Sequence, residues 1–168
     1  MNGDAYAGRR LRSFAICIRL AALFWAAAPL ATAAAPARYE AEVTAAVEAL
    51  VDAYSRNDHA AYFGTFADDI SIFRGPKGRW TKQDYQTAWT GVIARGGGVA
   101  KAGIADLRIQ MSPAGDAAIT TFLMPVKVKF PDVPPPDAKT DIVYNMTEIW
   151  FRTGRHWSLK HMSWTVQP

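Results

Sequence analysis

The stretch that decides the fold lies at the C-terminal end of the chain. Residues 139–166 read KTDIVYNMTEIWFRTGRHWSLKHMSWTV. Their alternation and their β-branched and aromatic content predict two strands, 139–152 and 156–166, joined by a tight turn at 153–155. With the turn there, Glu148 faces Lys160 across an antiparallel hairpin. A slip of one residue would move every side chain to the other face, so this register assigns the two faces of the sheet.

Two more strands precede this hairpin. Residues 102–112 and 116–130 alternate in the same way, and the sequence Ser-Pro-Ala-Gly at 112–115 has the composition of a turn. Residues 131–138, with three consecutive prolines, separate these strands from the hairpin. Sequential strands joined by turns predict a four-strand antiparallel meander.

The chain before these strands has the pattern of three helices. Asp58 is expected to cap a second, short helix that reaches residue 67, and a short strand over 70–73 should follow it. Thr81 and Asp84 resemble a capping box at the start of a third helix, which the glycines at 96–98 end. Helices followed by a sheet make an α+β domain. The first helix, over 40–56, is predicted by apolar residues spaced by four, three and four, namely Val43, Val47, Leu50 and Tyr54.

The N-terminus has the three parts of a secretory signal peptide. Residues 9–12 form a basic segment and residues 20–31 an apolar one, and Ala31-Thr32-Ala33 and Ala33-Ala34-Ala35 offer small-residue cleavage sites. The apolar run of about a dozen residues is shorter than the roughly 20 that span a bilayer, although a retained N-terminal anchor is the alternative. We therefore expect residues 1–33 to be removed and the mature protein to be secreted or periplasmic, with no stable membrane anchor.

Composition excludes several classes of function. The chain has 168 residues and a net charge of +4, but residues 34–168 hold fifteen basic and fourteen acidic residues, a net of +1. A domain this close to neutral, with no basic stripe, is not expected to bind nucleic acid. Cys17 is the only cysteine and lies in the predicted signal, and the three histidines are far apart in sequence, so neither a cofactor nor a metal site is expected.

The order of these elements, together with three short motifs, resembles a known family. Residues 53–58 (AYSRND), 66–72 (FADDISI) and 157–165 (WSLKHMSWT) are similar to landmarks of the SnoaL-like members of the nuclear transport factor two-like superfamily. The resemblance covers about residues 39–166. It implies a cone in which three N-terminal helices pack in a curled, mostly antiparallel sheet, one short strand plus the four-strand meander. The resemblance also implies a pocket at the wide end of the cone, usually in a dimer.

The resemblance leaves the activity open, because the family includes isomerases, dehydratases and non-catalytic modules. In its ketosteroid isomerases an aspartate base follows the first strand, and a tyrosine lies in the first helix. The matching positions here fall near Arg74 and Leu50. These replacements argue against that steroid chemistry.

The predicted register places His161 on the face assigned to the interior, opposite Thr147 and near Asn145 and Ser163. A histidine in a partly apolar pocket titrates near neutrality and can act as an acid or a base. The alternative is a histidine that holds two strands together through hydrogen bonds. Asn145, Thr147 and Ser163 would then orient a ligand or substrate.

Four more residues are candidate ligand contacts. Arg74, at the end of the first strand, can bind a carboxylate or another anion through its planar guanidinium, or can simply be exposed to solvent. Tyr54, Phe63 and Trp89 are expected to border a pocket for a flat apolar molecule.

The opposite face of the hairpin is expected to form a homodimer interface, because a large exposed apolar patch usually marks a contact surface. Three functions remain open: a binding domain for a small, largely apolar molecule, a lyase or isomerase that uses His161, and a dimerisation or accessory domain whose pocket is filled by its own aromatic side chains. The predicted interface residues are Tyr144, Met146, Trp150, Met162 and Trp164.

Overall fold

The computed structural model of the chain describes residues 34–130 and 141–168. The chain divides into two units, Met1–Ala34 and Ala35–Pro168, and the second contains the whole sheet. The predicted signal peptide lies outside the described residues.

Three helices precede most of the sheet: α2 (Ala34–Ser55), α3 (His59–Gly64) and α4 (Lys82–Ala94). The predicted caps are confirmed. The carboxylate of Asp58 accepts a hydrogen bond from the N–H of Ala61 at 3.0 Å, and Thr81 and Asp84 form a capping box. Helix α3 ends earlier than predicted, because Phe66 is already part of the first strand.

The strands form one mixed sheet in the order β2-β1-β7-β6-β5-β3, with β4 also paired to β5. Strand β1 runs parallel to β7, and the remaining pairs are antiparallel. A short 3-10 turn, η1 (Gly75–Lys77), joins β1 to β2. The strand bounds are β1 (Phe66–Arg74), β2 (Arg79–Trp80), β3 (Gly98–Ala102), β4 (Ala105–Met111), β5 (Ala117–Lys129), β6 (Asp141–Thr153) and β7 (His156–Val166).

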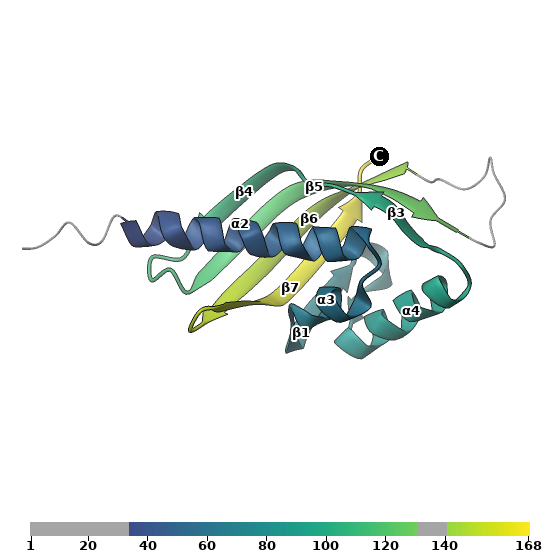
Figure 1. The fold of residues 1–168 in the computed structure, drawn as a ribbon, viewed down its shortest axis with the longest axis horizontal. Helices are drawn as coiled ribbons and strands as arrows, with labels where there is room; N and C mark the ends of the chain where they lie inside the picture. Colours follow the sequence, from purple (N-terminus) through teal and green to yellow (C-terminus); the bar gives the residue numbers. More distant parts are fainter. Residues whose placement is uncertain (1–33, 131–140) are drawn as a thin grey trace, which may run out of the picture. The chain divides into compact units, whose positions relative to one another are not determined.

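The predicted α+β class and its four-strand meander, β4 to β7, are confirmed. The sheet curls around α2, which lies along its inner face, while α3 and α4 lie toward the β1 edge (Figure 1). One prediction differs in detail: the strand expected over 102–112 is β4, and a separate strand, β3, precedes it directly after the glycines.

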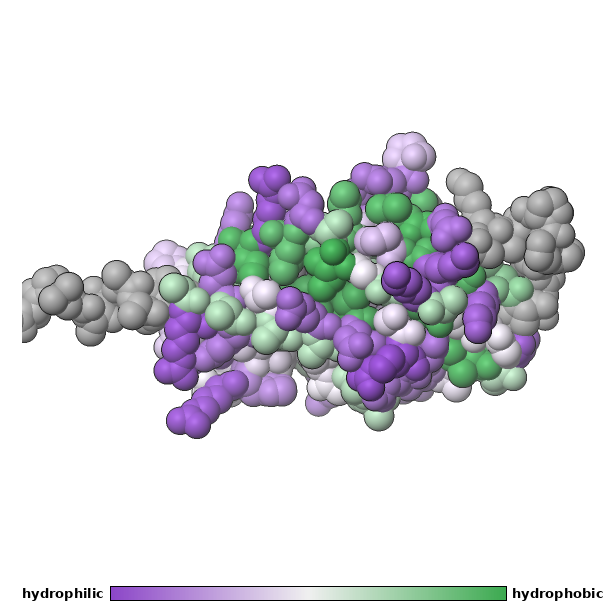
Figure 2. All heavy atoms as spheres, turned by 45° about the horizontal axis from the view of Figure 1, so that its top comes forward, coloured by the Kyte–Doolittle hydropathy of each residue, from purple (hydrophilic) through white to green (hydrophobic). Residues whose placement is uncertain are grey.

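The core lies between α2 and the inner face of the sheet. Trp150, Ile72 and Leu159 are fully buried, as are Val43 and Val47 of α2. Burial of each such side chain contributes about 1.5–3 kcal/mol. The inner face is less completely covered along β4, where apolar residues are only partly buried. Figure 2 shows hydrophobic residues at the surface on the face that it views, flanked by hydrophilic ones.

The predicted register of the β6–β7 hairpin is wrong in two places. The turn has two residues, so Thr153 pairs with His156, and a β-bulge follows between Trp150 and Ile149. Trp150 pairs with Leu159 and Ile149 pairs with His161, which leaves Lys160 as the extra residue. The bulge changes the phase of the apolar residues of β7, because three positions separate Leu159 from Met162, and a register of uniform alternation does not allow for it.

The shorter turn exchanges the predicted faces of β6, and the bulge exchanges those of β7 beyond Lys160. Met146, Glu148 and Trp150 point inward and are at most 5% exposed, and Glu148 pairs with Met162 rather than with Lys160. The expectation of an exposed interface patch is therefore wrong, because its residues face the core and the cavity described below. Dimerisation itself stays a prediction. The residues of the expected patch are Tyr144, Met146, Trp150, Met162 and Trp164.

Candidate ligand pocket

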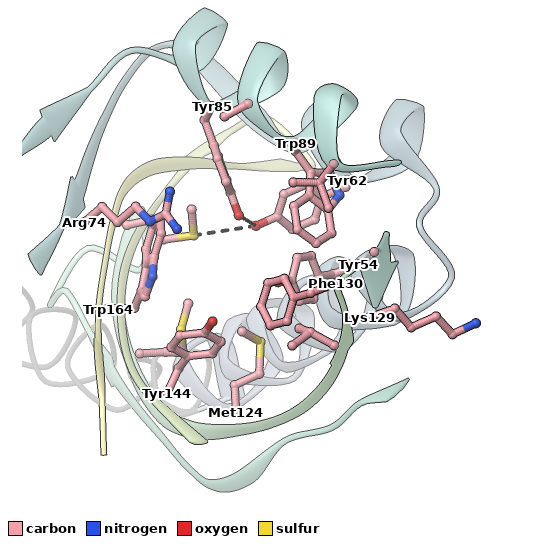
Figure 3. Close-up of a pocket in the computed structure, with 16 residues that line it drawn as sticks. Tyr54, Tyr62, Arg74, Tyr85, Trp89, Met124, Lys129, Phe130, Tyr144 and Trp164 are labelled. Carbon is pink, nitrogen blue, oxygen red and sulfur yellow. Dashed lines mark hydrogen bonds between the residues drawn. The ribbon is translucent and has the colours of Figure 1, made fainter. Parts of the chain in front are cut away.

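A cavity of about 140 Å³ lies between the helices and the inner face of the sheet (Figure 3). An engineered apolar cavity of about 150 Å³ binds benzene, so this volume suits one small ring. Its wall draws on all three helices and on strands β1, β3, β5, β6 and β7. Aromatic and sulfur-containing side chains dominate it: Tyr54, Tyr62, Tyr85, Trp89, Phe130, Tyr144, Trp164, Met124, Met146 and Met162.

Aromatic packing fixes the side of the cavity that the helices form. Tyr54, in the last turn of α2, stacks on Trp89 of α4, with ring centroids 5.3 Å apart and planes at 25°. Tyr85, on the same helix as Trp89, packs on Trp164 of β7 at 5.6 Å. Such pairs contribute about 0.5–1.5 kcal/mol beyond the area they bury, so they hold the wall in one arrangement.

Two tyrosine hydroxyl groups meet in this wall. The hydroxyl oxygens of Tyr62 and Tyr85 lie 3.2 Å apart, and the Tyr62 hydroxyl also donates to the sulfur of Met162 at 3.9 Å (Figure 3). Burial raises the pKa of Tyr85 to about 12 and that of Tyr62 well above its usual range. Both are therefore neutral phenols near pH 7, able to donate a hydrogen bond but unsuited to act as bases.

Arg74 brings a positive charge to the pocket from the end of β1. Its guanidinium carbon lies 4.9 Å from the centroid of the Trp80 ring, which is a cation–π contact. The charge of Arg74 acts to lower the pKa of Tyr85 and of Tyr144, against the larger effect of burial. Figure 3 shows the head of Arg74 beside Trp164 at the cavity wall.

Glu148 is a buried acid that the sequence analysis did not single out. It is 0% exposed, and its Oε2 accepts hydrogen bonds from the Thr120 hydroxyl at 3.1 Å and the Trp150 indole N–H at 3.0 Å. Among the described residues, Oε1 has no partner. Burial raises the pKa of this carboxyl to about 7. Glu148 does not line the cavity, but Met162, its partner across the ladder, does.

The predicted site residues divide between the cavity and other places. Tyr54, Arg74 and Trp89 line the cavity. Phe63 belongs to the core, 4% exposed and edge-on to Tyr62. The expected interior position of His161 is wrong: the bulge turns it to the outer face of the sheet, where it pairs with Ile149.

The three polar residues expected beside His161 also lie outside the cavity. Asn145, Thr147 and Ser163 alternate with inward-facing neighbours, and none of them lines the cavity. The spacing of three positions between Leu159 and Met162 is the sequence signal that would have indicated the bulge. The chemistry of the pocket is therefore set by the residues of the predicted interface, not by the predicted polar cluster.

Within residues 34–130 and 141–168, no three His, Cys, Asp or Glu side chains come together as metal ligands. In the same two ranges, no helix combines the length and the hydrophobicity needed to span a bilayer.

Solved structures similar to this one share its fold. A nuclear transport factor two-like protein from Cytophaga hutchinsonii aligns with a TM-score of 0.62 at 14% identity, over 74% of this chain and 95% of that one. A protein from Novosphingobium aromaticivorans, provisionally named a scytalone dehydratase, aligns with a TM-score of 0.65 at 11% identity, over 80% and 87%. One of unknown function from Pseudomonas putida KT2440 aligns at 0.60 and 20% identity, over 77% and 87%.

A search of curated proteins finds no match. The sequence profile of the SnoaL-like domain, in contrast, matches residues 43–166, which include most of α2 and every strand of the sheet. The chain therefore belongs to the SnoaL-like domain family, and its fold is that of nuclear transport factor two-like proteins.

Proposed function

We propose that this protein binds one small, flat, largely apolar molecule in the cavity. A SnoaL-like fold suggests a small-molecule-binding or isomerase-like domain, and the pocket favours the first. The observation that carries the proposal is the aromatic wall: side chains from three helices and the sheet surround a volume suited to one ring. Stacking of Tyr54 on Trp89 presents a flat surface against which such a ring can pack.

Acid–base catalysis has less support than binding. The described residues that line the cavity include no histidine and no carboxylate. The tyrosine hydroxyls there stay protonated near pH 7, and Glu148 does not line the cavity. The pocket filled by its own side chains also has less support, because the aromatic residues leave about 140 Å³ between them.

Export completes the proposal. A basic segment at 9–12, an apolar segment at 20–31 and small residues at 31–33 support cleavage of a signal peptide. The binding domain would then act outside the cytoplasm.

Binding can be tested with a variant that fills the cavity. Ala88 lines the cavity from α4 and is exposed, whereas its neighbour Thr87 is exposed and does not line it. Calorimetric titration with p-cresol and with indole should show saturable binding to the wild type and to Thr87→Trp, and at least tenfold weaker binding to Ala88→Trp. Equal binding to both variants would place the ligand elsewhere. Absence of binding to the wild type would contradict the proposal.

A further inference from the structure

We propose that the pocket selects small aromatic carboxylates, with Arg74 binding the carboxylate group. This inference rests on the proposed binding function and adds the chemical class of the ligand. The ring occupies the aromatic wall, and the carboxylate lies at the end of β1.

The guanidinium group of Arg74 has hydrogen-bond donors that no described residue occupies. A guanidinium group has five N–H donors and cannot lose its charge near neutral pH. Arg74 is half-buried, and its side chain forms a cation–π contact with Trp80. No described residue pairs with it as a carboxylate or accepts a hydrogen bond from its side chain. Its planar donors are therefore available to a bidentate acceptor, and a carboxylate has the matching geometry.

The wall of the cavity has a net positive charge. Arg74 and Lys129 are the charged residues among those that line it, and both are cations. Figure 3 shows the end of Lys129 pointing away from the cavity, whereas the head of Arg74 lies beside Trp164. An uncompensated cation in a wall of low polarity attracts an anion more strongly than it would in water. Carboxylate ligands are thus favoured over neutral ligands of the same shape.

Neutral tyrosines surround the charge of Arg74 in the cavity. Arg74 acts to lower the pKa of tyrosines from three elements, Tyr54 of α2, Tyr85 of α4 and Tyr144 of β6, so its field reaches across the cavity. The hydroxyl of Tyr85, paired with that of Tyr62, is on the same side of the cavity as the guanidinium (Figure 3). With Tyr62 donating to Met162, Tyr85 donates to the Tyr62 oxygen, and its one proton can turn from there to a ligand oxyanion as a second donor without adding charge. The cavity volume limits the ligand to about one ring.

The test compares benzoate with benzamide, which has nearly the same shape but no charge, and with toluene. The variant Arg74→Gln removes the charge. Its matched control is Arg79→Gln, because Arg79 is an exposed arginine of the neighbouring strand β2 that does not line the cavity. Dissociation constants are measured by calorimetry at pH 7.5 and moderate salt.

We expect the wild type and Arg79→Gln to bind benzoate at least tenfold more tightly than benzamide, as the loss of a charge-assisted hydrogen bond implies. Arg74→Gln should weaken benzoate binding at least tenfold and change toluene binding less than twofold. Equal binding of benzoate and benzamide to the wild type would overturn the inference and leave the proposed function standing. Failure of all three compounds to bind would overturn both. The wild-type comparison decides the matter even if Arg74→Gln does not fold.

Discussion

The carboxyl group of Glu148 accepts a hydrogen bond from the indole N–H of Trp150, two residues further along the same strand, and both side chains are fully buried. Residues i and i+2 of a strand share a face, so the pair lies side by side on the inner surface of the sheet. The hydroxyl of Thr120 on β5 donates to the same oxygen. The second oxygen has no partner among the described residues, which favours the protonated acid over the carboxylate.

This buried acid makes stability depend on pH. In the folded protein the pKa of Glu148 is about 7, against 4.5 for an unperturbed glutamate. Between these values the folded state binds the extra proton, so the contribution of Glu148 to the free energy of unfolding falls as the pH rises from 4.5 and levels off above 7. The full loss is about 3 kcal/mol. Glu148→Gln should therefore gain stability relative to wild type by about this amount between pH 4.5 and pH 8.

Urea unfolding at pH 4.5, 6 and 8 measures this difference. Glu48→Gln provides the control, because Glu48 is an exposed glutamate on α2. A stability difference between Glu148→Gln and wild type that does not change with pH would show that the acid is not protonated in the fold.

Single lysine substitutions on β6 distinguish the core face from the outer face. Met146 is 5% exposed, whereas its neighbour Asn145 is exposed. Met146→Lys buries a charge without a partner, and we expect it to abolish cooperative unfolding or to cost at least 3 kcal/mol. Asn145→Lys should stay within about 1 kcal/mol of the wild type. Thermal melts followed by circular dichroism report both values, and a folded, monomeric Met146→Lys would restore the interface interpretation.

Asn57 links the turn after α2 to the strand that begins beside the cavity. Its side chain accepts a hydrogen bond from the N–H of Val99 and donates one to the carbonyl of Val99, both at 2.8 Å. Its own φ is +57°, in the left-handed region. We expect Asn57→Gly to lose about 2 kcal/mol through the two hydrogen bonds, and Asn57→Ala about 1 kcal/mol more through backbone strain. Chemical denaturation of the two variants separates these costs; equal losses would show that the backbone is unstrained there.

Cleavage of the signal peptide gives a mass that can be measured directly. Expression of the full-length gene in a host that recognises such signals should yield a mature protein that begins at about residue 34–36, seen by intact mass spectrometry. Replacing the small residues Ala31 and Ala33 with leucine should block cleavage. A full-length protein in the membrane fraction of the unmodified strain would instead support the retained anchor.

Local features of this fold could be predicted from the sequence, and the register could not. The caps at Asp58 and Thr81 depend on a few neighbouring residues, and both form as expected. The partner of Glu148 depends on the turn and on one extra residue at Lys160, and a register that assumes uniform alternation includes neither. Both faces of the hairpin carry large apolar side chains, so the pattern did not show which face the helices cover.

The difference between local features and the hairpin register also explains which candidate site residues line the cavity. Tyr54, Arg74 and Trp89 were placed from helix periodicity and the end of a strand, and they line the cavity. His161 was placed from the hairpin register, and it lies outside. Glu148 was missed because the expected register put it opposite Lys160, where a surface ion pair would account for its charge.

The extra residue at Lys160 divides the last strand into two parts, which differ in whether odd or even positions face inward. Before it, Trp157 and Leu159 enter the core at odd positions; after it, Met162 and Trp164 face the cavity at even positions. Regular alternation along the whole strand would put His161 and Ser163 in the pocket wall, whereas deletion of Lys160 would remove the bulge and keep Met162 and Trp164 there. One extra residue in the last strand is thus what makes the wall of this pocket aromatic rather than polar.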